Sequence, residues 1–281
     1  VAYRFFSTDK RKYIVADTPG HEEYTRNMAT GASTADVAII LVDAEQGVLT
    51  QTRRHSFIVS MVGVKNVLLA INKLDLVEYS QQVYDDIVSE YREFADSALN
   101  LESITPVPIS ALMGDNVVNK SENTPWFNGQ TIMQYLETVE VSNQKALQSF
   151  RMPVQWVNRP NSKFRGFSGL IASGEINAGD EVRILPGGNT SHIKSIVTWE
   201  GELPKAKVGK SVTITLEDEI DVSRGDIIAL SSDPCGEADQ FQTRILWMNN
   251  DAMMPGRQYL LKSSTQSATL TLGKLKHRID V

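Results

Sequence analysis

The sequence predicts an α/β domain with a doubly wound parallel sheet, followed by a small β-barrel and the start of a second β-barrel. Three observations support this prediction. Apolar, β-branched runs alternate with helical stretches across residues 1–149. From about residue 150 to 237, short strands and glycine-containing turns recur at intervals typical of a barrel. From residue 238 to 281 a further β pattern begins that is too short to form a complete barrel.

The strand predictions in the first region come from continuous apolar runs. These runs cover residues 12–18, 36–44, 66–75 and 104–112. Runs of this kind are typical of strands buried on both faces of a parallel sheet. Each run is expected to end at the same edge of the sheet, where ligands of such folds bind.

Two helices are predicted from apolar residues at helical spacing. Residues 80–98 place Tyr84, Ile87, Tyr91 and Phe94 on one face, and Ser80 is the expected N-cap. Residues 131–139 carry a shorter apolar stripe. In the β-rich remainder, the expected strands include the run FQTRILWMN at residues 241–249.

The composition excludes several classes of protein. The chain has 281 residues with 41% hydrophobic and 22% charged residues, which is typical of a globular protein. No apolar run reaches the length of a membrane helix, so we expect no membrane partner. The net charge of −6 argues against a broad nucleic-acid surface. The single cysteine, Cys235, fits a reducing compartment, and we expect a cytoplasmic protein.

The first candidate motif is Asp17-Thr18-Pro19-Gly20-His21, which follows a predicted strand. A carboxylate at a strand end can hold Mg²⁺ through its water shell, so Asp17 is the candidate metal residue. Gly20 would let a backbone N–H approach a terminal phosphate, and His21 stands where an attacking water could be oriented. The alternative is an ordinary turn.

The second candidate motif is Asn72-Lys73-Leu74-Asp75, at the end of the third apolar run. The carboxylate of Asp75 can accept hydrogen bonds from N1 and the exocyclic amine of guanine, whereas adenine has an acceptor at N1. Lys73 can lie across the base plane, and Asn72 can connect neighbouring loops.

The third candidate motif, Ser110-Ala111-Leu112, follows the next run, and its small residues would let a backbone N–H meet the guanine oxygen. Each motif also occurs by chance. Their order, and their position at the ends of successive predicted strands, together predict a guanine-nucleotide site with GTP and Mg²⁺ as ligands.

These motifs, followed by the run GFSGLIASGEINAGDEV at residues 166–182, resemble the translational GTPases of the elongation factor Tu type. The resemblance implies a P-loop-type GTPase domain, at residues 1–149, followed by β-barrels. In that family a glycine-rich loop and a switch threonine stand upstream of the first motif seen here. We expect both to precede Val1 in a longer polypeptide, because a degenerate relative would have no use for base-selecting residues.

Several stretches are very similar to one branch, the GTPase subunits of bacterial sulfate adenylyltransferases. They are residues 5–58, 114–129, 151–169, 216–228 and 254–262. This resemblance implies a partner, the small catalytic subunit, which uses ATP and sulfate to make adenylyl sulfate and pyrophosphate. GTP hydrolysis would draw that unfavourable reaction forward. A translation elongation factor and a nucleotide-free scaffold are the alternatives.

Overall fold

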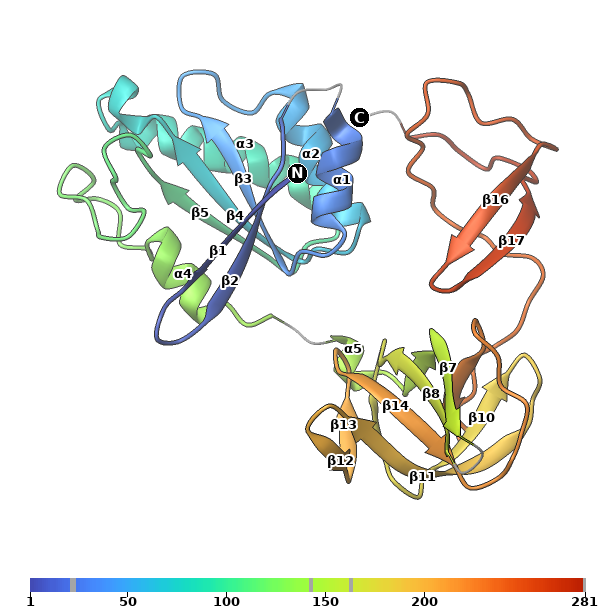
Figure 1. Ribbon diagram of the computed structural model, residues 1–281. Helices are drawn as coiled ribbons and strands as arrows, with labels where there is room; N and C mark the ends of the chain where they lie inside the picture. The colour runs from blue at the N-terminus through green and yellow to red at the C-terminus, as the bar shows by residue number, and fades with distance from the viewer. Residues whose placement is uncertain (21–23, 142–143, 162–163, 280–281) are drawn as a thin grey trace. The chain divides into compact units, whose positions relative to one another are not determined.

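The computed structural model describes residues 1–20, 24–141, 144–161 and 164–279 of the chain (Figure 1). It separates into two compact units. The first contains Val1–Val141, Ile245–Ala252 and His277–Val281, and the second contains Ser142–Arg244 and Met253–Lys276. The predicted division at residues 149 and 237 stays a prediction.

A parallel sheet of three strands forms the centre of the first unit. Its strands are β3 (Val37–Asp43), β4 (Asn66–Asn72) and β5 (Ser103–Pro108), in that spatial order. The register pairs Asp43 with Asn72 and Ile71 with Pro108. The carboxyl ends of all three strands therefore lie at one edge, which confirms the prediction for three of the four apolar runs. The prediction is wrong for the run at residues 12–18, which is not part of this sheet.

Helices cover both faces of this sheet at the central strand β4 (Figure 1). On one face, Val67, Leu69 and Ile71 pack in a core with residues of α1 (Thr25–Ala32), α2 (Thr50–Met61) and α3 (Gln81–Ala98). On the other face, Leu68 and Ala70 pack with Tyr135 of α4 (Ile132–Thr138). The predicted helices are confirmed, and Ser80 caps α3 by accepting a hydrogen bond from the Val83 N–H.

Helix α4 begins with a reciprocal cap at Thr131. The Thr131 hydroxyl accepts from the Gln134 N–H at 3.2 Å, and the Gln134 side chain accepts from the Thr131 N–H at 3.1 Å. Because Thr131 is fully buried, we expect Thr131→Ala to lower the free energy of unfolding by about 1–2 kcal/mol in urea titrations. Thr131→Ser keeps the hydroxyl and should recover most of the loss, and an equal loss in both variants would contradict the capping role.

Burial on both faces is confirmed for β4 but is wrong for two other predicted strands. In β3, Ile39 is 42% exposed and Leu41 is 62% exposed, because the short helix α4 packs against β4 and β5 on that face. Strand β2 (Lys12–Asp17) pairs with β1 (Ala2–Ser7) in a separate antiparallel hairpin, and most of its residues are exposed. Within the described residues, β3 pairs only with β4.

The second unit contains the predicted β-barrel architecture. Antiparallel strands follow the order β6-β15-β10-β11-β14-β8-β7 around a core that includes Phe150, Met152, Phe167 and Ile214. Its strands are β6 (Arg151–Pro153), β7 (Trp156–Asn161), β8 (Phe164–Leu170), β9 (Glu175–Asn177), β10 (Glu181–Leu185), β11 (Thr190–Thr198), β12 (Gly201–Leu203), β13 (Lys205–Lys207), β14 (Ser211–Leu216) and β15 (Ile227–Leu230). A short helix, α5 (Gln144–Leu147), precedes them.

The last part of the chain forms one hairpin, β16 (Gln258–Ser263) with β17 (Gln266–Thr271). The expected strand at 241–249 is wrong, because that segment has no strand pairing. Instead Leu246 and Met248 pack against the core of the first unit, and the Met248 carbonyl accepts a hydrogen bond from Arg26 at 2.9 Å. The Met248 carbonyl therefore bonds a side chain of α1 and not a neighbouring strand.

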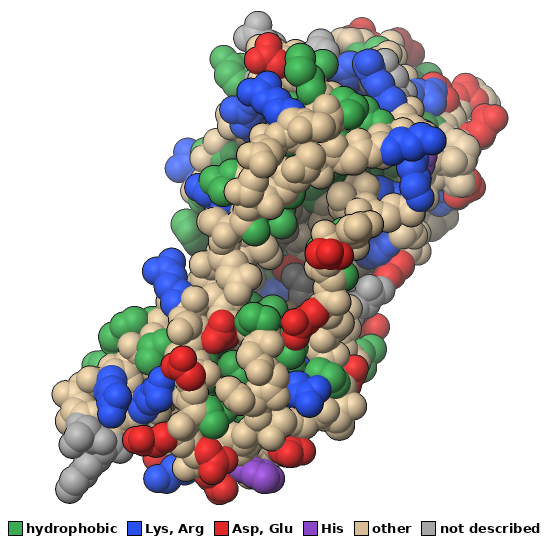
Figure 2. All heavy atoms as spheres, turned by 90° about the vertical axis from the view of Figure 1, so that its right-hand side faces the viewer, with side chains coloured by type: hydrophobic (Ala, Val, Ile, Leu, Met, Phe, Trp, Pro, Cys, Tyr) green, Lys and Arg blue, Asp and Glu red, His purple; other side chains and the backbone are tan. Residues whose placement is uncertain are grey.

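Charged side chains of both signs are interspersed on the face shown in Figure 2, in keeping with a modest net charge. None of the described helices has the length and apolar character needed to cross a membrane.

Candidate guanine-nucleotide site

Asn72 joins two of the three candidate motifs. It is the last residue of β4, and its side-chain Oδ1 accepts a hydrogen bond from the Ala111 N–H at 2.9 Å. The backbone continues this connection, because the Leu74 N–H donates to the Ile109 carbonyl at 3.2 Å. The loops that follow β4 and β5 are thus tied together at the edge where the strands end, as the sequence predicted for Asn72.

Lys73 leaves the sheet in an unusual conformation and forms an ion pair. Its φ is +63°, a left-handed conformation that costs a non-glycine residue free energy and is common at binding sites. Its Nζ lies 2.6 Å from Oδ2 of Asp43, the last residue of β3. This hydrogen bond lowers the pKa of Asp43 and raises the pKa of Lys73. Asp43 therefore anchors the ammonium while the stem of Lys73 stays half exposed.

The Asp43–Lys73 pair predicts a stability change at low pH. A carboxyl group whose folded pKa is lowered adds stability above its unfolded pKa, and that stability is lost as the pH falls through the folded value. For Asp43 the window lies below 3.8. Denaturant titrations of the wild type should lose stability there, and Asp43→Asn should lose less. Equal pH profiles for the two proteins would contradict the prediction.

Asp75 lies in a short 3-10 helix, η2 (Leu74–Val77), directly after Lys73. Leu74 is fully buried and fixes the start of this turn. Asp75 is half-buried, and within the described part of the chain its carboxylate makes no hydrogen bond or ion pair. A carboxylate left open at the mouth of a parallel sheet fits the two donors on the edge of guanine.

A hydrogen-bond network around Asp115 connects the segment after η2 to the loop that follows β5. Asp115 accepts a hydrogen bond from the Tyr79 hydroxyl at 2.8 Å and one from the Ser121 hydroxyl at 2.6 Å. The first of these bonds raises the pKa of Tyr79. Tyr79 also has a left-handed backbone, with φ of +54°. Because hydrogen bonds to a charged group are among the stronger ones, this network stabilises a strained loop beside Asp75.

The third motif begins with a buried serine and then turns outward. Ser110 is fully buried, and its hydroxyl accepts a hydrogen bond from the Met113 N–H at 3.2 Å. Ala111 is exposed, and the side chain of Leu112 is 87% exposed. The serine therefore shapes the turn, and the Ala111 N–H within it is already bonded to Asn72.

The first motif is attached to two helices. Packing against α1 is close, since a Cβ on Gly31 would lie 2.7 Å from the Thr18 methyl carbon. At the other end of the loop, the Gly20 carbonyl accepts a hydrogen bond from Gln51 of α2 at 2.9 Å. Asp17 is exposed and Pro19 is half-buried. His21, the candidate catalytic residue, lies outside the described residues.

Metal binding through the first motif would rest on one protein carboxylate. Among residues 1–20, 24–141, 144–161 and 164–279, no group of three or more histidine, cysteine, aspartate or glutamate side chains could hold a metal ion. A single carboxylate such as Asp17, with phosphate oxygens and water, is the usual donor set for nucleotide-bound Mg²⁺. The exposed position of Asp17 fits that arrangement.

The structure joins the second and third motifs by hydrogen bonds and connects the first motif to α1 and α2. Sequence reasoning missed Asp43, Tyr79, Asp115 and Gln51, which support the candidate residues. For Asp43 a signal was present, because it ends an apolar run just as Asp17 and Asn72 do. Tyr79 and Asp115 have no such signal, since their pairing depends on two loops meeting in space.

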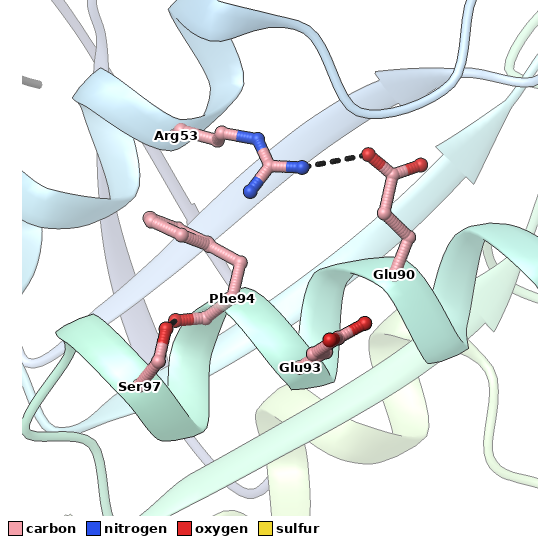
Figure 3. Close-up of a pocket in the computed structure, with 5 residues that line it drawn as sticks. All are labelled: Arg53, Glu90, Glu93, Phe94 and Ser97. Atoms are coloured by element: carbon pink, nitrogen blue, oxygen red, sulfur yellow. Dashed lines mark hydrogen bonds and ion pairs between the residues drawn. The ribbon is translucent and has the colours of Figure 1, made fainter.

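A shallow pocket of about 310 Å³ lies between α2 and α3, lined by Arg53, Glu90, Glu93, Phe94 and Ser97. Figure 3 shows the Arg53 guanidinium above the Phe94 ring and directed toward Glu90. The Arg53–Glu90 distance is 2.7 Å. None of the sequence-predicted site residues lines this pocket, and Arg53 is already paired with a carboxylate and a ring.

Known proteins match the chain along its whole length. It is 54% identical over 281 residues to sulfate adenylyltransferase subunit 1 of Saccharophagus degradans, covering 100% of this chain and 59% of that protein. It is 55% identical over 284 residues to the bifunctional enzyme CysN/CysC of Rhodopirellula baltica, covering 100% of this chain and 44% of that protein. The chain thus spans about three-fifths or less of the length of these curated relatives.

A family model described as the elongation factor Tu GTP binding domain matches residues 1–150. The match includes all three candidate motifs and the parallel sheet that carries the second and third of them. It covers more than half of the 281 residues. The chain therefore belongs to the elongation factor Tu GTP-binding domain family.

Proposed function

We propose that the protein binds and hydrolyses GTP as the regulatory subunit of a sulfate adenylyltransferase. The observation that carries the proposal is the joined loop pair at the sheet edge, where Asn72 ties residue 111 beside the open carboxylate of Asp75. The family match supports the nucleotide class, and the identity to sulfate adenylyltransferase subunit 1 supports the reaction served.

In this proposal the second and third motifs bind the base, and the first motif serves the phosphates. Asn72, Lys73 and Asp75 bind the guanine base, with Leu74, Ser110, Ala111 and Leu112 shaping the pocket around it. Asp17, Thr18, Pro19 and Gly20 contact the Mg²⁺ and terminal phosphate side. His21 orients the attacking water. Bound Mg²⁺ would supply charge neutralisation at the phosphates.

The proposed partner is a separate catalytic subunit that carries ATP and sulfate. Adenylyl sulfate formation is unfavourable, so a reaction with a large favourable free energy must be coupled to it. Loops that order with the terminal phosphate and relax after hydrolysis can provide such coupling. We place this assembly in the cytoplasm, in keeping with the single cysteine of the chain.

The proposal is tested by measuring GTP hydrolysis with purified full-length protein. Hydrolysis should increase when the small catalytic subunit, ATP and sulfate are all present, and adenylyl sulfate should accumulate with GTP consumption. Omitting sulfate is the matched control. If the complete mixture leaves the hydrolysis rate unchanged, the regulatory role is wrong.

A translation factor remains the second candidate, because the matching family model is named for elongation factor Tu. Such a protein should respond to ribosomes in place of sulfate and ATP. Running both arms with one protein preparation separates the two functions, since stimulation by ribosomes alone would favour the translation factor.

A further inference from the structure

One side chain of α2 reaches the backbone of the first motif. Gln51 is the second residue of α2, and its Nε2 lies 2.9 Å from the Gly20 carbonyl oxygen. The same Nε2 lies 2.8 Å from Nε2 of His55, one helical turn further along. Gln51 and His55 are both half-buried.

The chemistry of these three atoms permits a single pattern of hydrogen bonds. A carbonyl oxygen only accepts, so the amide nitrogen of Gln51 must face Gly20 and donate one hydrogen. The second hydrogen of that nitrogen points to His55, whose Nε2 must accept it. His55 is therefore neutral, with its proton on Nδ1. Burial, together with the nearby charge of Arg54, lowers the pKa of His55 and favours this form.

We propose that Gln51, oriented by His55, is a positioning residue that holds the Asp17–Gly20 loop for GTP hydrolysis. The hydrogen bond holds the Gly20 carbonyl, and with it the carboxyl end of the Asp17–Gly20 loop. Thr18 is already packed on α1, so Gln51 supplies the second anchor of the loop. This inference rests on the proposed function as a GTPase.

The test compares Gln51→Ala, Gln51→Glu, His55→Ala and the Gln51→Ala/His55→Ala double variant in the full-length protein. Gln82→Ala is the matched control, because Gln82 is exposed on α3 and bonds Asp86 on its own helix. We expect Gln51→Ala to lower single-turnover GTP hydrolysis about threefold to tenfold, the value of one net hydrogen bond. The dissociation constant of a fluorescent GDP should stay within about twofold of the wild-type value.

Two further results distinguish positioning from general damage. Gln51→Glu should be at least as slow as Gln51→Ala, because a carboxylate repels the Gly20 carbonyl. The double variant should be no slower than Gln51→Ala alone, because His55 acts through Gln51. Additive losses, an unchanged rate in Gln51→Ala, or an equal loss of GDP affinity would overturn the inference.

Hydrogen exchange gives a readout that does not depend on hydrolysis. With GDP bound, the peptide covering residues 15–24 should exchange faster in Gln51→Ala than in the wild type or in Gln82→Ala. If the wild type failed to hydrolyse GTP, the proposed function would fail while this readout still tested the anchor. Unchanged exchange in Gln51→Ala would show that the anchor does not hold the loop.

Discussion

Replacing Asp75 with asparagine is expected to weaken GDP and GTP binding about 100-fold or more, because two hydrogen bonds from guanine to a charged acceptor are disturbed. The asparagine amide presents a donor to one of the two guanine donors, so one pair becomes repulsive. Xanthine carries a carbonyl in place of the exocyclic amine and would accept from that amide. Titration with fluorescent GDP and with the xanthine analogue should therefore show opposite changes in affinity.

Asp85→Asn is the matched control for this change, since Asp85 is an exposed aspartate on α3 in the same unit. It should leave both affinities near the wild-type values. The model of guanine selection fails if Asp75→Asn keeps its preference for GDP, or if the wild type binds ATP as tightly as GTP.

Replacing Asn72 with alanine is expected to weaken guanine-nucleotide binding about tenfold, near the upper end for one net hydrogen bond. The lost contact is the 2.9 Å hydrogen bond from the Ala111 N–H to the Asn72 side chain. Ala111 is exposed, so water can replace Asn72 and the fold itself should be little affected. The loss should therefore appear as faster dissociation of GDP in stopped-flow measurements, as expected when a preorganised loop becomes mobile.

Asn72→Asp provides a control that retains an acceptor at the same position. It should dissociate GDP more slowly than Asn72→Ala, because the Ala111 N–H keeps a partner. A comparable unfolding midpoint for all three proteins is also expected. The role of Asn72 as a connection between loops is contradicted if alanine and aspartate behave alike.

Elements that depend on neighbouring residues could be predicted from the sequence better than features that depend on contacts between distant segments. The central strand was predicted well because residues 67–71 are all apolar and are buried from both sides. Helix α3 was predicted with its N-cap because spacing and capping are properties of neighbouring residues. Burial of β2 and β3 was not predictable in the same way, since exposure of Ile39 and Leu41 depends on how far α4 extends across the sheet.

The order of the candidate residues, and their position at the ends of apolar runs, can be read from the amino-acid sequence alone. The partners that support these residues follow from the fold: Asp43 pairs with Lys73, residue 111 with Asn72, and Gln51 with Gly20. These partners lie 30, 39 and 31 positions apart along the chain. Residue type and short-range periodicity are properties of neighbouring residues, whereas contacts over such separations depend on strand register and on where helices pack.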